Sequence, residues 1–283
     1  MGFSLPTGGP FLVRYNGSNR AIRAFIVMVR SINFMNGKII LVTGGGRGIG
    51  AACALLAAQQ GYTVCINYRT DDMAAATVAA AIEDAGGSAL TIKADVADEC
   101  EVERMFALID ERFGRIDALI NNAGILSTQM RVDQMDAGRI NRIMATNVTG
   151  SFLCAREAVS RMSTSHGGRG GGIVNLSSRA AVLGSAGEFV DYAASKAAVD
   201  ALTIGLAKEV ANEKIRVNGV RPGLIHTAMH ASGGEPGRVG RLQSGVPMAR
   251  GGEPVEVAKA VLWLLSDDAS YTTGSFIDVS GGR

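Results

Sequence analysis

The 283-residue sequence lacks an excess of either charge, with 28 basic against 26 acidic side chains. Proteins that bind nucleic acids through the phosphates carry a basic surplus, so this balance argues against a nucleic-acid partner. No apolar run approaches the ~20 residues that cross a bilayer, which argues against a membrane protein. Cysteines are also few, and the spacing of the four matches no metal-binding motif. Because Cys53 and Cys65 lie in apolar segments, we expect buried free thiols and a reducing, cytoplasmic compartment.

Two motifs of hydrolytic enzymes are missing as well. No serine stands in a G-x-S-x-G sequence, which argues against a hydrolase with a serine nucleophile of that type. His226 and His230 have the spacing of two zinc ligands on a helix, but the glutamate of H-E-x-x-H is absent and Pro222-Gly223 lies just upstream. We therefore expect no metal site.

Apolar strand-like runs alternate with helix-like segments along most of the chain. This alternation predicts an α/β fold with a mostly parallel, doubly wound sheet and helices on both faces. No internal linker or repeat is visible, so we expect a single domain over residues 37–283. Ligands of such sheets bind where the carboxyl ends of the strands meet. The expected strands are 38–43, 63–68, 88–95, 117–123, 172–178, 215–222 and 275–279, and the expected helices include 71–85, 98–113, 133–163 and 190–212.

The first expected strand ends in a glycine-rich turn, Thr43-Gly-Gly-Gly-Arg-Gly-Ile-Gly50, which leads into a helix-like segment. Glycine permits a positive φ and a close approach of the backbone to a ligand. The helix that follows points free N–H groups and its positive dipole end at an anion. Strand, glycine turn and helix in this order predict a dinucleotide site, although the spacing Gly44-x3-Gly48-x-Gly50 differs from G-x-G-x-x-G.

Tyr192 and Lys196 stand four residues apart in a helix-like segment, so both side chains are expected on one helical face. A nearby ammonium favours the phenolate, and we therefore expect the pKa of Tyr192 to fall below its usual ~10. A phenol tuned in this way exchanges a proton near neutral pH. By itself the pair is a weak signal, since a Tyr and a Lys also share many ordinary helix surfaces.

The glycine turn, Asn121-Asn-Ala-Gly124, Tyr192-x3-Lys196 and Pro222-Gly223 occur in the order and spacing of the short-chain dehydrogenases/reductases. The chain resembles this family over about residues 36–283. The resemblance implies a Rossmann-type fold and an oxidoreductase that transfers a hydride between NADP(H) and an alcohol or carbonyl substrate. A 3-oxoacyl thioester, a sugar, and a small ketone or aldehyde all remain open as the substrate. The alternative is a non-enzymatic NADP(H)-binding sensor that kept the fold.

The resemblance also implies which residues contact the cofactor. They come from the glycine turn, the ends of the following strands, the Tyr-Lys pair and the Pro-Gly-x3-Thr segment. The expected cofactor-binding residues are Gly44, Arg47, Gly48, Ile49, Gly50, Arg69, Asp95, Val96, Asn122, Ala123, Gly124, Tyr192, Lys196, Pro222, Gly223 and Thr227.

The end of the second strand bears on the choice between NAD and NADP. NAD-binding folds commonly place Asp or Glu there to bond the ribose 2′-hydroxyl, whereas this strand ends Asn67-Tyr68-Arg69. Arg69 and Arg47 are able to hold a 2′-phosphate through charge-assisted bonds, which favours NADP over NAD. Asp71 and Asp72 follow closely, and we expect them to start the next helix.

The resemblance implies four catalytic residues, Asn147, Ser178, Tyr192 and Lys196. Tyr192 acts as the general acid/base, Lys196 stabilises its phenolate, Ser178 bonds the substrate oxygen, and Asn147 helps to hold a proton-relay water. The family usually has its serine 13 residues before the tyrosine, but Arg179 occupies that position here. We interpret this as a one-residue insertion that makes Ser178 the active serine, with Ser177 as the alternative.

Three expectations concern the rest of the molecule. Residues 1–36 contain four arginines and no acid, and they form a dispensable extension, an organellar presequence or an extra arm, of which we favour the first. Residues 223–252 lack strong periodicity and are expected to form a mobile lid over the substrate. Members of the family are commonly tetramers, so a homotetramer is expected, with the helical segments 133–163 and 190–212 and the C-terminal strand at its interfaces.

Overall fold

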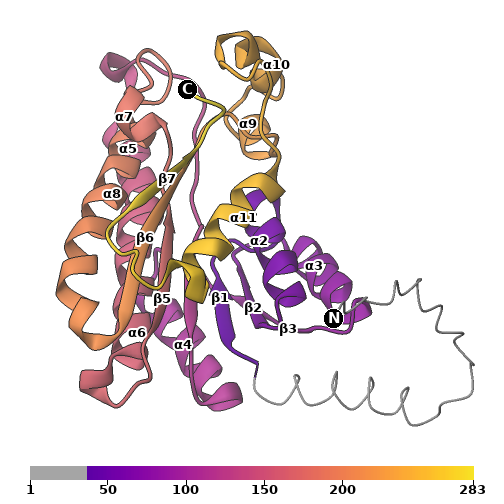
Figure 1. The fold of residues 1–283 in the computed structure, drawn as a ribbon. Coiled ribbons are helices and arrows are strands. Elements are labelled where there is room, and N and C mark those ends of the chain that lie inside the picture. Colours follow the sequence, from indigo (N-terminus) through magenta and orange to yellow (C-terminus); the bar gives the residue numbers. More distant parts are fainter. Residues whose placement is uncertain (1–36) are drawn as a thin grey trace, which may run out of the picture. The chain divides into compact units, whose positions relative to one another are not determined.

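The computed structural model describes residues 37–283, and residues 38–283 form one compact unit (Figure 1). The expected extension, residues 1–36, lies outside the described residues. Seven strands make one sheet in the order β3-β2-β1-β4-β5-β6-β7, and every strand pairing is parallel. The strands are β1 (Ile39–Val42), β2 (Thr63–Tyr68), β3 (Ser88–Lys93), β4 (Ala118–Asn121), β5 (Gly171–Leu176), β6 (Ile215–Pro222) and β7 (Phe276–Val279). The predicted α/β fold is confirmed, with a sheet that is wholly parallel.

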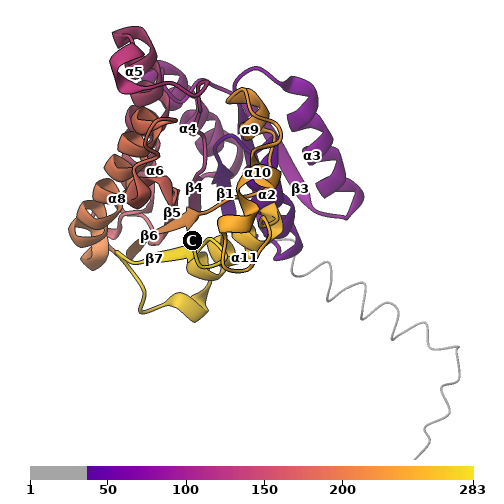
Figure 2. The same ribbon diagram turned by 90° about the horizontal axis from the view of Figure 1, so that it is seen from above.

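Helices cover both faces of this sheet (Figure 2). Strand side chains alternate between two apolar cores: Ile40 and Val42 of β1 enter one, and Ile39 and Leu41 enter the other. The first core is closed by α2 (Gly48–Gln59), α3 (Asp72–Asp84) and α11 (Pro254–Leu265). The second is closed by α4 (Glu99–Phe113), α6 (Gly150–Met162) and α8 (Val190–Val210). Strands buried on both sides explain why the sequence shows continuous apolar runs.

Side-chain caps determine where several helices begin. The Asp71 carboxylate accepts a hydrogen bond from the Ala74 amide at 3.0 Å, as expected for a residue that starts α3. Asp98 caps α4 through the Glu101 amide at 3.0 Å, and the residue that follows the last turn of α4 is Gly114, whose φ is +66°. Glycine tolerates this left-handed geometry without a Cβ clash.

The single helix expected over residues 133–163 is divided in the structure. A 3-10 turn (Val132–Gln134) precedes α5 (Ala137–Met144), and a π-helical stretch (Ala145–Thr149) joins α5 to α6. Asp136 sets the start of α5, because its side chain accepts from the Arg139 amide at 2.6 Å. The π-helical stretch rotates the residues that follow it relative to α5, and it carries Asn147.

Residues 223–252, the segment expected to act as a lid, contain the short helices α9 (Met229–Ser232) and α10 (Arg238–Leu242). In Figure 1 these helices stand above the upper end of the sheet. A β-bridge between Ile225 and Gly252 ties the two ends of the segment together. Leu224, Val239 and Val246 form a small apolar cluster of their own. The segment therefore has its own packing, and its movement as a lid stays a prediction.

Candidate functional site

Two adjoining cavities lie at the carboxyl ends of the strands. The first, of about 480 Å³, reaches from the ends of β5 and β6 to α8 and the segment 223–252. The second, of about 240 Å³, lies over the turn between β1 and α2 and the ends of β2, β3 and β4. The residues that line both cavities are Ile49, Asn122, Leu126, Thr227 and Met229. The sheet order reverses direction between β1 and β4, and ligands of doubly wound sheets bind at this switch point.

The glycine turn is held in place by two asparagines. Asn67 accepts from the Gly44 amide at 3.2 Å and donates to the Ala94 carbonyl at 2.9 Å, which ties the turn to β2 and β3. Asn122 donates to the carbonyls of Thr43 at 2.8 Å and Gly44 at 3.1 Å, which ties the turn to β4. The side-chain amide of Asn122 is thus engaged in hydrogen bonds within the protein. Asn67 was not identified from the sequence, where it reads as an ordinary strand residue.

Fifteen of the sixteen expected cofactor-binding residues line one or both cavities. The exception is Gly50, which packs against the glycine turn behind the cavity wall. A Cβ added at Gly50 would lie 2.3 Å from the Gly44 carbonyl oxygen and 2.5 Å from Asn122 Nδ2. A side chain at this position would push α2 away from the turn, so the need for glycine here is steric.

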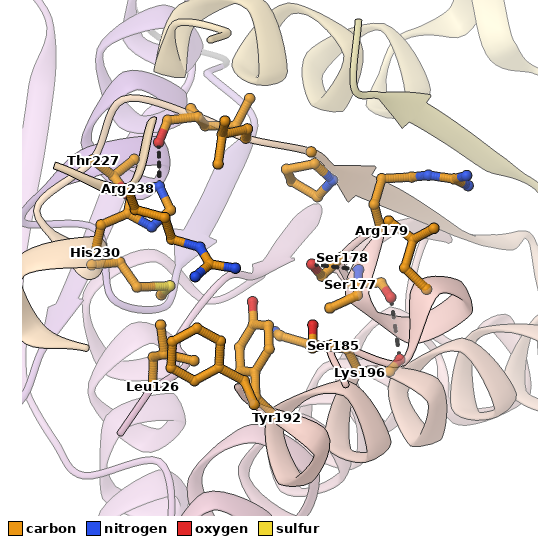
Figure 3. Close-up of a pocket in the computed structure, with 18 of the residues that line it drawn as sticks. Leu126, Ser177, Ser178, Arg179, Ser185, Tyr192, Lys196, Thr227, His230 and Arg238 are labelled. Atoms are coloured by element: carbon orange, nitrogen blue, oxygen red, sulfur yellow. Dashed lines mark hydrogen bonds between the residues drawn. The ribbon is translucent and has the colours of Figure 1, made fainter. Parts of the chain in front are cut away.

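Tyr192 and Lys196 lie one turn apart on α8, and both line the larger cavity together with Ser178, which follows β5 (Figure 3). Lys196 is 4% exposed, and its Nζ donates to the Leu176 carbonyl at 2.7 Å. The same Nζ lies 5.8 Å from the centroid of the Tyr192 ring. The end of a buried strand thus holds the ammonium beside the phenol.

The sequence predicted a lowered pKa for Tyr192, and this direction was wrong. Burial raises the pKa of Tyr192 above its ordinary value, and a hydrogen bond with Ser178 only partly opposes this. Burial also lowers the pKa of Lys196 to about 8, against the opposing effect of the Asp200 carboxylate. Both shifts have one cause. Burial removes water from the charged form of each group, and the interactions with neighbouring side chains do not make up for the lost hydration free energy.

The buried lysine gives the protein a specific pH dependence of stability. The pKa of Lys196 falls from 10.5 to about 8, so between these values the unfolded chain holds a proton that the folded chain has lost. Stability therefore rises with pH in this window. Between about pH 8 and about pH 10, we expect the melting temperature of the wild type to rise relative to the melting temperature of Lys196→Met. The measurement is thermal unfolding of both proteins across this pH range. Parallel curves for the two proteins would contradict this expectation.

The two candidate serines have different surroundings, although both line the larger cavity. The Ser177 hydroxyl is buried and donates to the Lys196 carbonyl at 3.2 Å, so it serves the packing of α8 against β5. The Ser178 hydroxyl accepts from the Ala180 amide at 3.1 Å and lies close enough to Tyr192 to oppose the rise in the pKa of the phenol. Arg179 turns toward the end of the chain, where it pairs with Asp278 at 2.6 Å. The geometry therefore favours Ser178 as the serine that accompanies the tyrosine.

Asn147 lies behind the cavity wall and is fully buried. Its Oδ1 accepts from the Ile125 amide at 2.8 Å, and its Nδ2 donates to the Ile125 carbonyl at 3.1 Å and to Ser195 Oγ at 3.0 Å. A Cβ at Gly124 would lie 3.4 Å from both Asn147 Oδ1 and Lys196 Nζ, so these two polar atoms border one point. Asn147 thus joins the segment after β4 to α8.

Known proteins are similar to this chain in sequence and in fold. A family profile described as enoyl-(acyl carrier protein) reductase matches residues 43–283. An uncharacterized oxidoreductase of Escherichia coli, YgfF, is 60% identical over 87% of this chain and 99% of its own length. A 3-oxoacyl-[acyl-carrier-protein] reductase of Synechocystis is 37% identical over 88% and 97%. A short-chain type dehydrogenase/reductase from Mycobacterium marinum superposes with a TM-score of 0.82 at 36% identity, covering 90% of this chain and 98% of its own.

The chain is a short-chain dehydrogenase/reductase. Family membership makes it an oxidoreductase with a Rossmann-type fold, as the sequence predicted, and the family uses NAD(P) cofactors. Among residues 37–283 of this dehydrogenase/reductase, no helix is long and apolar enough to span a membrane. Within the same range, no three His, Cys, Asp or Glu side chains gather as metal ligands.

The smaller cavity of this dehydrogenase/reductase has the features that a dinucleotide needs. Gly44 and Gly48 have positive φ values of +62° and +55°, which expose the backbone of the turn to the cavity. A Cβ at Gly48 would come within 3.4 Å of the Thr227 side chain, which lines both cavities. The amino-terminal N–H groups of α2 follow directly. These residues fit a pyrophosphate-bearing cofactor.

One buried ion pair of the dehydrogenase/reductase was missed from the sequence. Arg139 on α5 donates from Nε to Asp191 Oδ2 at 2.7 Å and from Nη1 to the Thr128 carbonyl at 2.6 Å. The Asp191 carboxylate also accepts from the Tyr192 amide at 2.8 Å. The side chains of Arg139 and Asp191 are only 6% and 2% exposed. This pair fixes the first turn of α8, where Tyr192 begins the Tyr-x3-Lys motif.

Proposed function

We propose that this dehydrogenase/reductase transfers a hydride between NADP(H) and an alcohol or carbonyl substrate, with Tyr192 as general acid/base. The observation that carries the proposal is the convergence of Tyr192, Lys196 and Ser178 on one cavity that adjoins the glycine turn. A 3-oxoacyl thioester, a sugar and a small ketone or aldehyde remain the substrate classes to test.

Reduction of a carbonyl adds a hydride to carbon and a proton to oxygen, and the nicotinamide, when bound, supplies the hydride. Tyr192 donates the proton to the developing alkoxide. Its raised pKa keeps the phenol protonated and ready to donate at neutral pH. Ser178 bonds the same oxygen and stabilises its growing negative charge. Lys196, whose pKa is about 8, is mostly charged at pH 7 and stabilises the phenolate left behind.

The test is NADPH oxidation by the full chain across a panel of ketones, aldehydes, oxidised sugars and 3-oxoacyl thioesters. We expect turnover of at least one class. The competing hypothesis is a sensor that binds NADP(H) without chemistry, and it predicts tight NADPH binding with no consumption of any compound. Such an outcome, repeated in the oxidative direction with the corresponding alcohols, would overturn the proposed activity.

NADP is the proposed cofactor because the cavity over the end of β2 is lined by Arg47 and Arg69 and has no acid at the strand tip. Arg47 has no ion-pair partner among residues 37–283, whereas Arg69 contacts Asp95 at 3.6 Å. Arg47 is therefore the freer of the two to bind a 2′-phosphate. Asp71 also lines this cavity, but its carboxylate accepts the hydrogen bond that caps α3.

We expect Arg47→Ala to raise the KM for NADPH about tenfold, because one charge-assisted bond to phosphate is lost, and to leave the KM for NADH unchanged. Arg69→Ala has a smaller effect of the same kind. Lys93→Ala is the matched control, since Lys93 is a basic residue at the end of β3 that pairs with Asp72 and lines neither cavity. Equal changes for both cofactors would refute the assignment of NADP to these arginines.

We also propose a cytoplasmic homotetramer. The free thiols Cys53, Cys65 and Cys154 are buried, which suits a reducing compartment. Phe152 on α6 and Ile204 on α8 are large apolar side chains that are about half exposed, on the two helical segments expected at interfaces. Light scattering should give a mass about four times 29.4 kDa. A monomer at micromolar concentration would rule the tetramer out.

A further inference from the structure

Four charged side chains connect the segment 223–252 to the loop that precedes α8. We call Glu188, Glu235, Arg238 and Arg241 the charge bridge. Glu188 lies four residues before Tyr192 and contacts Arg238 at 2.5 Å and Arg241 at 3.0 Å. Glu235 contacts Arg238 at 3.1 Å and also pairs with Arg241. Two acids and two bases make the bridge neutral.

Only two members of the charge bridge line the larger cavity, namely Glu188 and Arg238. Arg238 is buried, and its guanidinium packs over the Phe189 ring at 4.8 Å. Figure 3 shows the Arg238 side chain in the same cavity as Tyr192 and Ser178. Arg241 and Glu235 meet the same partners but lie outside the lining. The bridge therefore presents one cation and one anion, already paired, to any substrate.

Glu188 is held in its charged form at neutral pH. Burial by itself would raise the pKa of Glu188, but hydrogen bonds from Arg238 and Arg241 outweigh it and lower the pKa below its ordinary value. An anionic substrate that reached for Arg238 would have to displace this carboxylate. It would also place a second negative charge beside Glu188, and the repulsion between like charges is unfavourable.

We propose that Glu188 masks Arg238 and thereby makes the enzyme select carbonyl substrates that are uncharged at the end remote from the reacting carbon. Arg238 has the chemistry to bind a substrate carboxylate, and its pairing with Glu188 prevents this. This inference rests on the proposed function for its kinetic readout. Its physical basis is that the buried Arg238 guanidinium, when it has lost Glu188 and kept only Glu235, has capacity for another anion, and a substrate carboxylate has the matching planar geometry.

The test compares substrates of equal chain length that end, away from the ketone, in either a methyl group or a carboxylate. We would measure kcat/KM for 2-hexanone against 5-oxohexanoate, and for 2-octanone against 7-oxooctanoate, in the wild type and in Glu188→Gln. The glutamine keeps the shape of the side chain and leaves the charge bridge with one positive charge in excess. In Glu188→Gln we expect the kcat/KM of the carboxylate divided by the kcat/KM of the ketone to rise about tenfold or more over the wild type. This is the effect of one charge-assisted hydrogen bond.

Arg241→Met is the matched control. It removes contacts to the same two glutamates, but from outside the cavity and with the opposite change of charge. In Arg241→Met we expect the ratio of kcat/KM for the carboxylate to kcat/KM for the ketone to equal the wild-type ratio or to fall below it. The gain in Glu188→Gln should disappear in the double variant Glu188→Gln/Arg238→Met, which has no cation to unmask. A rise in Arg241→Met equal to that in Glu188→Gln would mean that loosening of segment 223–252 is responsible, and the proposal would be lost.

A binding experiment separates this proposal from the proposed activity. Titration of 5-oxohexanoate into the full chain with NADP+, followed by ligand-observed NMR, needs no turnover. Tighter binding to Glu188→Gln than to wild type supports the masking of Arg238 even if no protein reduces any ketone, an outcome that would overturn only the enzymatic role. Unchanged binding and an unchanged kinetic ratio would overturn the masking while leaving the activity in place.

Discussion

Tyr192→Phe should lower kcat for carbonyl reduction by about 10³, within the range that a positioned general acid supplies. The substitution removes one hydroxyl and keeps the ring that packs beside Lys196, whose Nζ lies 5.8 Å from the ring centroid. The measurement is NADPH oxidation with whichever carbonyl compound the panel identifies. The Kd for NADPH should change little, because the phenylalanine preserves the wall of the cavity. A variant with near wild-type kcat would remove Tyr192 from the mechanism.

The neighbouring serines provide a matched control for this result. Ser178→Ala should lower kcat by about 10², because a hydrogen bond to the developing oxyanion is lost. Ser177→Ala removes the same atom from a residue that lines the same cavity, but its hydroxyl is bonded to the Lys196 carbonyl. We expect only a small change there. A larger loss in Ser177→Ala than in Ser178→Ala would reverse the assignment that the one-residue insertion suggested.

Arg139→Met should be the most destabilising single change considered for this protein. It leaves the Asp191 carboxylate buried without its partner, and breaking such a pair from one side costs about 3–5 kcal/mol of unfolding free energy. For a chain of this size each kcal/mol lowers the melting temperature by ~2–4 °C, so we expect a fall of about 10 °C. Activity should fall as well, because Asp191 also accepts from the amide of Tyr192.

Two variants show whether the cost comes from the buried unpaired charge. Arg131→Met breaks the exposed pair with Asp133 in the same region and should cost less than about 1 kcal/mol. Adding Asp191→Leu to Arg139→Met removes the stranded carboxylate, and we expect it to restore much of the melting temperature. If the double variant melts lower than Arg139→Met alone, the stranded carboxylate is not the source of the cost and the desolvation argument fails.

The strands and the glycine turn were predictable because local sequence determines them. Apolar strand-like runs marked β2 and β6 to the residue, and the Tyr-x3-Lys spacing needs only a helix. The break in residues 133–163 was missed because it depends on one cap, Asp136, and on a π-helical stretch without a clear sequence signature. The boundaries of a helix are decided by single side-chain bonds that a periodic pattern does not reveal.

The rest of the site depends on contacts between distant parts of the chain. Arg139 and Asp191 are 52 residues apart, and Glu188 and Arg238 are 50 apart, so neither pair can be recognised by spacing. The pKa of Tyr192 was predicted in the wrong direction for a related reason. The nearby lysine is visible in the sequence, but the burial that dominates the shift is not.

The sheet order has a consequence for how the chain acquires its structure during synthesis. β1, β2 and β3 are neighbours in space and in sequence, so they can pair as soon as they emerge from the ribosome. β4 must then add to the open side of β1, with Ile40 meeting Ala118, a contact that closes a long loop and is slow to form. Until that pairing is complete, the glycine turn lacks its anchor on Asn122. Nucleotide affinity should therefore appear only after β4 has docked against β1.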